Sequence, residues 1–275
     1  MTKIAIFQAR SGIDPAANAQ ALVTAIAEAA NGGAEILFTP EMSGLLDRDT
    51  ERARGSVRPA EEDTVLAACR EAARRHSIWM HLGSLAVAAD GGKFANRGFV
   101  IDSSGEVRAS YDKIHLFDVD LPTGESWRES AVYRGGSDAV VVDGTPVGRL
   151  GLTICYDLRF PALFERLSEA GSQVVSVPAA FTVPTGKAHW QVLLRARAIE
   201  AGVFVVAAAQ SGRHEDGRET YGHSLLANPW GEIIVDMGEQ VGVAFGDVDL
   251  CEIDIVRQRV PALRHRRPIG EVSER

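Results

Sequence analysis

The chain has 275 residues, of which 45% are hydrophobic and 24% are charged, and its formal net charge is -8. This length is near the upper limit for a single hydrophobic core, so we expect one large domain or two tightly merged halves. The acidic balance gives no general attraction to a polyanion and argues against nucleic acid and anionic membrane surfaces as partners.

The first half of the chain begins with a strand over residues 3–9, KIAIFQA. An alanine-rich amphipathic helix follows over residues 15–31 and ends at Gly32-Gly33. Next come the buried strand AEILFTPE, the helix DTVLAACREAARRHS, the strand IWMHLGSLAV and two shorter strands around the turn DSSGE. The predicted order is β-α-β-α-β-β.

The second half repeats this order with the strand RLGLTIC, the helix PALFERLSEAG, the strand SQVVSVPA, the helix AHWQVLLRARAIEAG, the strand VFVVAAAQSG and the split segment YGHSLLANPWGEIIVD. The halves also correspond residue by residue, since NGGAEILFTPE matches EAGSQVVSVPA. Two such halves, each with helices on one sheet face, can bury their open faces against each other. We therefore predict an α/β protein with a four-layer α-β-β-α sandwich and an internal pseudo-repeat.

We expect residues 1–275 to form a single domain, because no low-complexity segment or flexible linker separates the halves. The basic run RQRVPALRHRR lies near the end of the chain. Such charge runs are usually solvated or paired with opposite charges. Residues 257–275 are therefore predicted to be a C-terminal extension that docks on an acidic surface.

The cysteines and the N-terminus indicate where the protein resides. Cys69, Cys155 and Cys251 are too widely spaced for a disulfide framework, which favours a reducing cytoplasm. The segment MTKIAIFQAR has no signal-peptide core, and no segment reaches 18 uninterrupted apolar residues. We expect a soluble, cytoplasmic protein with no membrane partner.

The two halves differ at the ends of their strands. Glu41 follows a strand proline in the first half, where the second half has Ala179. Cys155 follows the first strand of the second half, where the first half has Gln8 or Ala9. The sequence thus places one reactive group in each half, at matching strand ends.

Each candidate has a structural alternative. Cys155 at a strand-to-helix turn lies near the positive end of a helix dipole, which favours a thiolate, but free cysteine is often a buried small hydrophobe. Glu41 can serve as a general base, or it can be a surface or capping carboxylate. Lys113, in YDKIHLFD, can stabilise negative charge, or its ammonium can extend to solvent.

Together these three residue types suggest acyl transfer through a thioester. The lysine ammonium can hold the thiolate and then the developing oxyanion, while the glutamate moves protons. The histidines form no H-x-x-x-H pair and the cysteines no C-x-x-C pair, so we expect no metal and no cofactor.

FTPEMS, YDKIHLFD and GLTICYDLRFP resemble, in this order, the three catalytic motifs of the nitrilase superfamily of carbon-nitrogen hydrolases. The resemblance runs from about residue 3 to residue 267. It implies the four-layer fold, with Glu41, Lys113 and Cys155 as the catalytic residues. By the same resemblance, Glu129 supports the lysine and the substrate, and the amide of Tyr156 joins Lys113 in the oxyanion hole.

The segments AFTVPTGKAHWQVLLRARAIEAGVFVVAAAQSGRH and YGHSLLANPWGE are similar to the Nit-type branch, particularly the deaminated glutathione amidases. The resemblance implies an amidase that cleaves a small carboxylate-bearing amide through a thioester on Cys155. Omega-amidases acting on 2-oxoglutaramate or 2-oxosuccinamate are close relatives and remain an alternative, as does a nitrilase. The branch also implies a homodimer or larger assembly through the tryptophan-bearing helix.

Two readings outside this class stay open. A catalytically idle binding or scaffold protein would not need the three residues, and a Cys-His peptidase would use Cys155 with His115 or His189. For the amidase, a substrate carboxylate needs a local basic group. Arg159, four residues after Cys155, is the candidate for that carboxylate clamp, with a structural role as the alternative.

Overall fold

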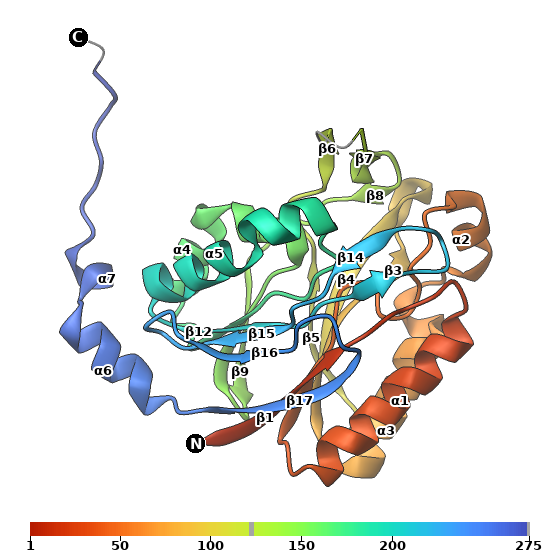
Figure 1. The fold of residues 1–275 in the computed structure, drawn as a ribbon, viewed down its shortest axis with the longest axis horizontal. Helices are drawn as coiled ribbons and strands as arrows, with labels where there is room; N and C mark the ends of the chain where they lie inside the picture. Colours follow the sequence, from red (N-terminus) through yellow and green to blue (C-terminus); the bar gives the residue numbers. More distant parts are fainter. Residues whose placement is uncertain (121–123, 274–275) are drawn as a thin grey trace.

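The computed structural model describes residues 1–120 and 124–273, and its centre is formed by two facing sheets (Figure 1). The first sheet has the strand order β17-β1-β2-β3-β4-β5, with β8 paired to β4; its strands are β1 (Thr2–Gln8), β2 (Ile36–Phe38), β3 (Trp79–Ala88), β4 (Phe94–Ile101), β5 (Val107–Asp112), β8 (Tyr133–Arg134) and β17 (Gly242–Val248). The second has the order β16-β15-β12-β11-β10-β9, with β9 (Val140–Thr145), β10 (Gly148–Leu152), β11 (Val174–Ser176), β12 (Phe204–Ala207), β15 (Leu225–Ala227) and β16 (Ile233–Asp236).

Helices cover the outer face of each sheet. Figure 1 shows α1 (Pro15–Asn31) and α3 (Thr64–His76) beside the first sheet, and α4 (Pro161–Glu169) and α5 (Val183–Ala201) beside the second. Strand β1 shows the layering, because Ala5 and Phe7 pack with the α1 and α3 side chains. Ile4 and Ile6 instead join the core shared with the second sheet. The predicted α-β-β-α sandwich is confirmed.

Local sequence explains why the predicted helices form. Asp14 caps α1 by accepting a hydrogen bond from the Ala16 amide at 2.9 Å, and Pro15 occupies the first turn. Asp63 caps α3 in the same way through the Leu66 amide, at 2.8 Å. Both helices lie within one residue of their predicted bounds.

Other elements differ from the prediction. Helix α5 begins at Val183, five residues earlier than expected, because Pro184 fits the first helical turn. Its Trp190 is 1% exposed and packs inside the subunit, with its indole N–H donated to the His223 carbonyl at 2.8 Å. Trp190 therefore belongs to the core of the subunit, and the assembly expected through this helix depends on other side chains.

Several short elements carry too little periodicity to be predicted. They are α2 (Thr50–Ser56), the hairpin β6 (Asp118–Asp120) with β7 (Ser126–Arg128), the hairpin β13 (Ser211–Arg213) with β14 (Glu219–Tyr221), and the outer strands β9 and β17. Single 3-10 turns are η1 (Ala60–Glu62), η2 (Asp90–Gly92), η3 (Glu129–Ala131) and η4 (Cys155–Arg159).

The outer strands exchange between the halves. Strand β9 follows the first half in the chain and pairs antiparallel with β10, the first strand of the second half. Strand β17 follows the second half and pairs antiparallel with β1, from Thr2 opposite Val248 to Gln8 opposite Gly242. Each half therefore completes the sheet of the other.

The predicted C-terminal extension, residues 257–275, begins inside α6 (Cys251–Arg259). After α7 (Ala262–His265), the Arg266 guanidinium lies 3.4 and 3.5 Å from the carboxylates of Glu165 and Glu169 on α4. This is the acidic contact expected for the basic run, while residues 274–275 of the segment lie outside the described residues. Across the described chain, no helix combines the length and apolarity needed to cross a membrane.

Candidate active site

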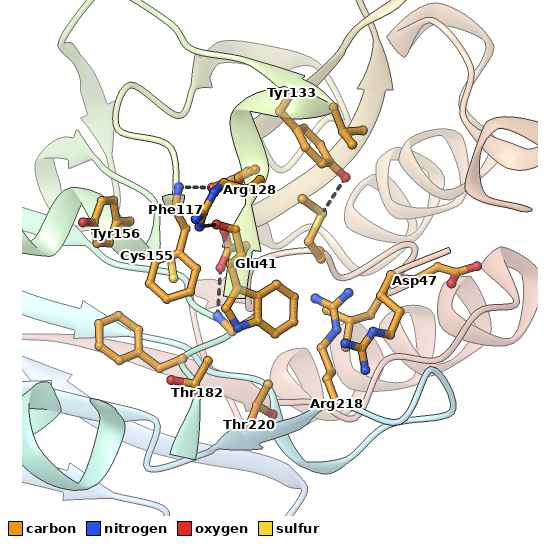
Figure 2. Close-up of a pocket in the computed structure, with 18 of the residues that line it drawn as sticks. Glu41, Asp47, Phe117, Arg128, Tyr133, Cys155, Tyr156, Thr182, Arg218 and Thr220 are labelled. Carbon is orange, nitrogen blue, oxygen red and sulfur yellow. Dashed lines mark hydrogen bonds between the residues drawn. The ribbon is translucent and has the colours of Figure 1, made fainter. Parts of the chain in front are cut away.

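Turns at neighbouring strand ends bring the predicted residues to one cavity of about 310 Å³ (Figure 2). Glu41 follows β2, Lys113 follows β5, and Cys155 opens the 3-10 turn after β10. Glu129 begins η3, beyond the β6–β7 hairpin. All four side chains line the cavity, although as many as 114 residues separate them in the sequence, from Glu41 to Cys155.

Lys113 lies at the centre of a buried ion cluster. Its ammonium is 2.9 Å from the Glu41 carboxylate and 2.9 Å from the Glu129 carboxylate, and its side chain is 2% exposed. Burial alone lowers the pKa of Lys113, but the charges of Glu129 and Glu41 outweigh it and hold that pKa well above its ordinary value. The ammonium therefore stays charged, and the alternative in which it extends to solvent is wrong.

Glu41 is fixed from both halves of the molecule. Its Oε1 accepts from the Asn96 amide at 2.8 Å, and its Oε2 accepts from the Ala180 backbone N–H at 2.8 Å. Gln210 donates to the Glu41 backbone carbonyl at 3.0 Å. Asn96 also donates to Glu129, at 3.2 Å, so one amide orients both carboxylates. Glu41 is thus a buried, oriented carboxylate and not a surface or capping one.

Cys155 is held in a strained backbone conformation. Its φ is 51°, in the left-handed region that non-glycine residues seldom occupy, and its N–H donates to the Pro178 carbonyl at 2.9 Å. Burial, followed by the charge of Glu41, raises the pKa of the Cys155 thiol well above its usual value, and Lys113 only partly opposes this. The expected thiolate is therefore corrected to a resting thiol, which needs a base before it can attack.

Asp157 is the residue that fixes this turn, and this role was not predicted from the sequence. Its buried carboxylate accepts from the Tyr111 hydroxyl at 2.7 Å, from the Ile154 amide at 2.9 Å and from the His115 amide at 3.0 Å. The ring Nδ1 of His115 lies 2.7 Å from the same carboxylate. The sequence signal for this role was an acidic residue, Asp157, two residues after the apolar run that ends at Cys155.

Tyr156 contributes both its ring and its backbone to the site. The ring packs edge-on against Phe117, with centroids 5.1 Å apart, and both residues line the cavity. The Tyr156 amide has no hydrogen-bond acceptor among the described residues. A free amide directly after the nucleophile can donate to a developing oxyanion.

Arg159 and the two candidate histidines lie outside the cavity lining. The Arg159 guanidinium lies over the rings of Tyr156 and Phe181 and 3.2 Å from the Nδ1 of His189. Stacked behind those rings, Arg159 does not contact the cavity as the carboxylate clamp would require. His115 stacks on Phe160 with ring centroids 3.6 Å apart. Among the described residues that line the cavity there is no histidine, which disfavours the Cys-His peptidase.

The rest of the wall was not anticipated from the sequence. It contains the aromatic side chains of Phe94, Phe117, Trp127, Tyr133 and Phe181, and the charged side chains of Asp47, Arg48, Arg128, Arg218 and Glu219. Phe94 lies in β4 and Tyr133 in β8, and Phe117 and Phe181 lie in connecting segments. The charged residues and Trp127 come from the segment before α2 and from the two hairpins. Because such elements show no periodic pattern, no signal in the sequence directed these side chains to one cavity.

The chain matches a family model described as carbon-nitrogen hydrolase over residues 3–258. The deaminated glutathione amidase of Yersinia enterocolitica is 40% identical over 248 residues, which cover 89% of this chain and 86% of that protein. The nitrilase and fragile histidine triad fusion protein NitFhit of Caenorhabditis elegans is 40% identical over 266 residues, which cover 96% of this chain. The chain spans only 60% of the length of that fusion protein.

Solved structures share the fold. The crystal structure of C. elegans NitFhit superposes with a TM-score of 0.88 at 39% identity, over 97% of this chain and 65% of that one. A mutant of the amidase from Nesterenkonia sp. AN1 gives 0.81 at 27% identity, over 97% and 94% of the two chains. In that amidase the acetamide moiety of fluoroacetamide is covalently added at the active site cysteine.

Proposed function

The chain belongs to the carbon-nitrogen hydrolase family, and from this premise we propose that it is an amidase with Cys155 as nucleophile, Glu41 as general base and acid, and Lys113 as oxyanion stabiliser. The observation that carries the proposal is the convergence of these side chains on one cavity, with the ammonium 2.9 Å from the Glu41 carboxylate. The covalent adduct on the cysteine of the Nesterenkonia amidase supports the same role for Cys155.

In the acylation step, Glu41 takes the thiol proton and the sulfur attacks the amide carbon. The resulting oxyanion is held by the Lys113 ammonium and the Tyr156 amide. Glu41 then gives the proton to the amide nitrogen, the carbon-nitrogen bond breaks, and the amine leaves a thioester on Cys155. Glu129 acts through Lys113, because its carboxylate orients the ammonium at 2.9 Å.

In the deacylation step, Glu41 takes a proton from water, and the hydroxide attacks the thioester carbon. The same two donors hold the second oxyanion. The carbon-sulfur bond then breaks, the acid product leaves, and the proton on Glu41 returns to the thiolate. One carboxylate thus serves both steps, and neither step requires a metal or a cofactor.

We propose a small carboxylate-bearing amide of the deaminated glutathione type as the substrate, which the name of the Yersinia relative supports. The test is to measure product release from deaminated glutathione, 2-oxoglutaramate, succinamate and simple nitriles. The proposal expects the highest kcat/KM with deaminated glutathione. A preference for 2-oxoglutaramate would indicate an omega-amidase, and ammonia release from nitriles alone would indicate a nitrilase.

We also propose a homodimer or larger assembly through α5, in a protein located in the cytoplasm. Val192 and Ile199 on this helix are 67% and 53% exposed, and Trp230 in the adjoining turn is 51% exposed. Arg195 joins the turn to the helix by donating to the Gly231 carbonyl at 2.7 Å. A contiguous apolar surface of this kind is typical of a subunit interface. Light scattering after size exclusion at micromolar concentration tests this, and a monomer would contradict it.

A further inference from the structure

The cavity wall formed before α2 and by the β13–β14 hairpin carries two arginines with unused donors. Arg48 lies shortly after the Glu41 turn, and Arg218 lies directly before β14. Within the described chain, the Arg48 guanidinium donates no hydrogen bond. The Arg218 guanidinium donates only through Nε, to Asp216. Figure 2 shows Arg218 and Thr220 across the cavity from Cys155.

Asp216 holds the segments that carry Arg48 and Arg218 together by hydrogen bonds. Its carboxylate accepts from the Arg218 Nε at 2.6 Å, from the Arg218 backbone N–H at 3.0 Å and from the Arg48 backbone N–H at 3.0 Å. The Asp216 side chain is fully buried, so it ties the two segments together while leaving the terminal nitrogens of both guanidinium groups free. The pair is therefore organised before any ligand arrives.

Trp127 provides an apolar surface beneath both arginines. The guanidinium carbon of Arg48 lies 5.8 Å from the centroid of the indole ring, and that of Arg218 lies 5.2 Å away. Planar guanidinium groups stacked on an aromatic ring keep their edges available for hydrogen bonds.

The other charged groups of this wall are mostly neutralised. Asp47 receives two hydrogen bonds from Arg52, at 2.6 and 2.7 Å, and Arg128 binds both carboxylate oxygens of Asp120 at 2.9 Å. Glu219 lines the same wall, is exposed, and has no ion pair among the described residues. The terminal nitrogens of the two neighbouring arginines have no carboxylate partner among the described residues. Such a pair favours the binding of a planar anion.

We propose that Arg48 and Arg218 form a subsite for a carboxylate at the end of the substrate remote from the amide that is cleaved. The inference rests on the proposed amidase function and specifies the substrate class. The substrate is an extended amide whose terminal carboxylate lies across the cavity from Cys155 (Figure 2). An amide whose single carboxylate lies close to the scissile carbonyl does not reach both ends of the cavity.

The test compares deaminated glutathione with the analogue in which its terminal glycine carboxylate is a carboxamide. Calorimetric binding to the full-length Cys155→Ala protein should favour the carboxylate by about tenfold, as expected for a charge-assisted hydrogen bond. Arg48→Gln and Arg218→Gln, each added to Cys155→Ala, should reduce this preference to about two-fold or less. Arg128→Gln is the matched control, because Asp120 already pairs with that guanidinium, and it should keep the tenfold preference.

A preference that survives in Arg48→Gln would overturn the subsite, as would an equal loss of affinity for both analogues. Arg48 is exposed, so Arg48→Gln should not disturb the fold. This variant therefore tests the subsite even if Arg218→Gln disturbs the hairpin. Turnover by the wild-type enzyme separates this result from the proposed function. Binding that prefers the carboxylate without any product release would reject the amidase assignment and keep the subsite, whereas equal kcat/KM for the two analogues would reject the subsite alone.

Discussion

The turn after β2 in the first half and the turn after β10 in the second half are built alike but carry different chemistry. Each contains a non-glycine residue in the left-handed region, with φ of 55° at Met42 and 51° at Cys155. Each is also bonded to the other half: Glu41 accepts from the Ala180 amide, and Asp157 in the second-half turn accepts from the Tyr111 hydroxyl. The repeated scaffold is therefore symmetric while the reactive groups are not, and these groups meet only because the two sheets pack face to face.

Replacement of the Cys155 thiol in the second-half turn should have the largest effect on catalysis. Cys155→Ser is nearly isosteric, but the covalent step needs sulfur, so kcat/KM should fall by at least about 100-fold. The measurement is product release, together with mass spectrometry of the Cys155 peptide after incubation of the wild type with substrate. Circular dichroism of the variant checks that the fold is retained. A residual rate above a hundredth of wild type would make the nucleophile assignment wrong.

Replacement of the Glu41 carboxylate in the first-half turn should stop proton transfer but leave the Cys155 nucleophile in place. Glu41→Gln keeps the shape and an acceptor oxygen but cannot take the thiol proton, so kcat should fall by about 10²- to 10⁴-fold. Rapid-quench and steady-state assays on the same substrate measure this. The variant Glu28→Gln, on α1, is a matched control that should not change kcat. Activity that survives in Glu41→Gln would indicate a different base.

Asp157→Asn should weaken the second-half turn itself. The carboxylate accepts hydrogen bonds from Tyr111, Ile154 and His115, and an amide nitrogen in its place would face these donors. The free energy of unfolding should fall by roughly 2 kcal/mol, as for buried groups left without a partner. Urea denaturation measures the change. Ser11→Ala removes a hydroxyl that donates to the Ser43 carbonyl and accepts from the Gln210 side chain, which also donates to the Glu41 carbonyl. This loss of neutral hydrogen bonds should cost less than Asp157→Asn, and the reverse order of the two free energies would contradict the prediction.

The reactivity of Cys155 should respond in opposite directions to the two buried charges. Glu41 raises the pKa of the thiol and Lys113 lowers it, so Glu41→Gln should move the alkylation profile to lower pH and Lys113→Met should move it to higher pH. The rate of modification by iodoacetamide as a function of pH measures this, with Cys251, which is exposed, as the internal reference. Shifts in the same direction for both variants would contradict the assignment of these charges.

The smallest effect is expected at Arg159. Its guanidinium stacks over Tyr156 and Phe181 outside the cavity, so Arg159→Lys should change the ratio of kcat/KM for acidic and neutral amides by less than about two-fold. Paired assays of an acidic amide and a neutral amide of similar size give this ratio. A selective rise in KM for the acidic amide would restore Arg159 as the carboxylate clamp.

The sequence predicted the parts of this molecule that have local causes. The periodicity and caps of α1 and α3 give their bounds, and the apolar run before Glu41 indicates that this carboxylate lies at a strand end. Asn96 and Asp157 were missed because their roles depend on partners 33 to 55 residues away. Arg159 was assigned from its spacing after Cys155, but its position depends on His189, 30 residues later.

The exchange of outer strands also constrains how the chain reaches this fold. Strand β1 is made before the other strands of the first sheet, yet its antiparallel partner β17 ends at Val248, so the edge of β1 stays uncovered until β17 has been synthesised. Pairings of such large sequence separation close slowly, and an uncovered apolar strand invites aggregation on the ribosome or after it. A nascent chain that stops before residue 242 would therefore expose one edge of its first sheet, although it already contains Glu41, Lys113 and Cys155.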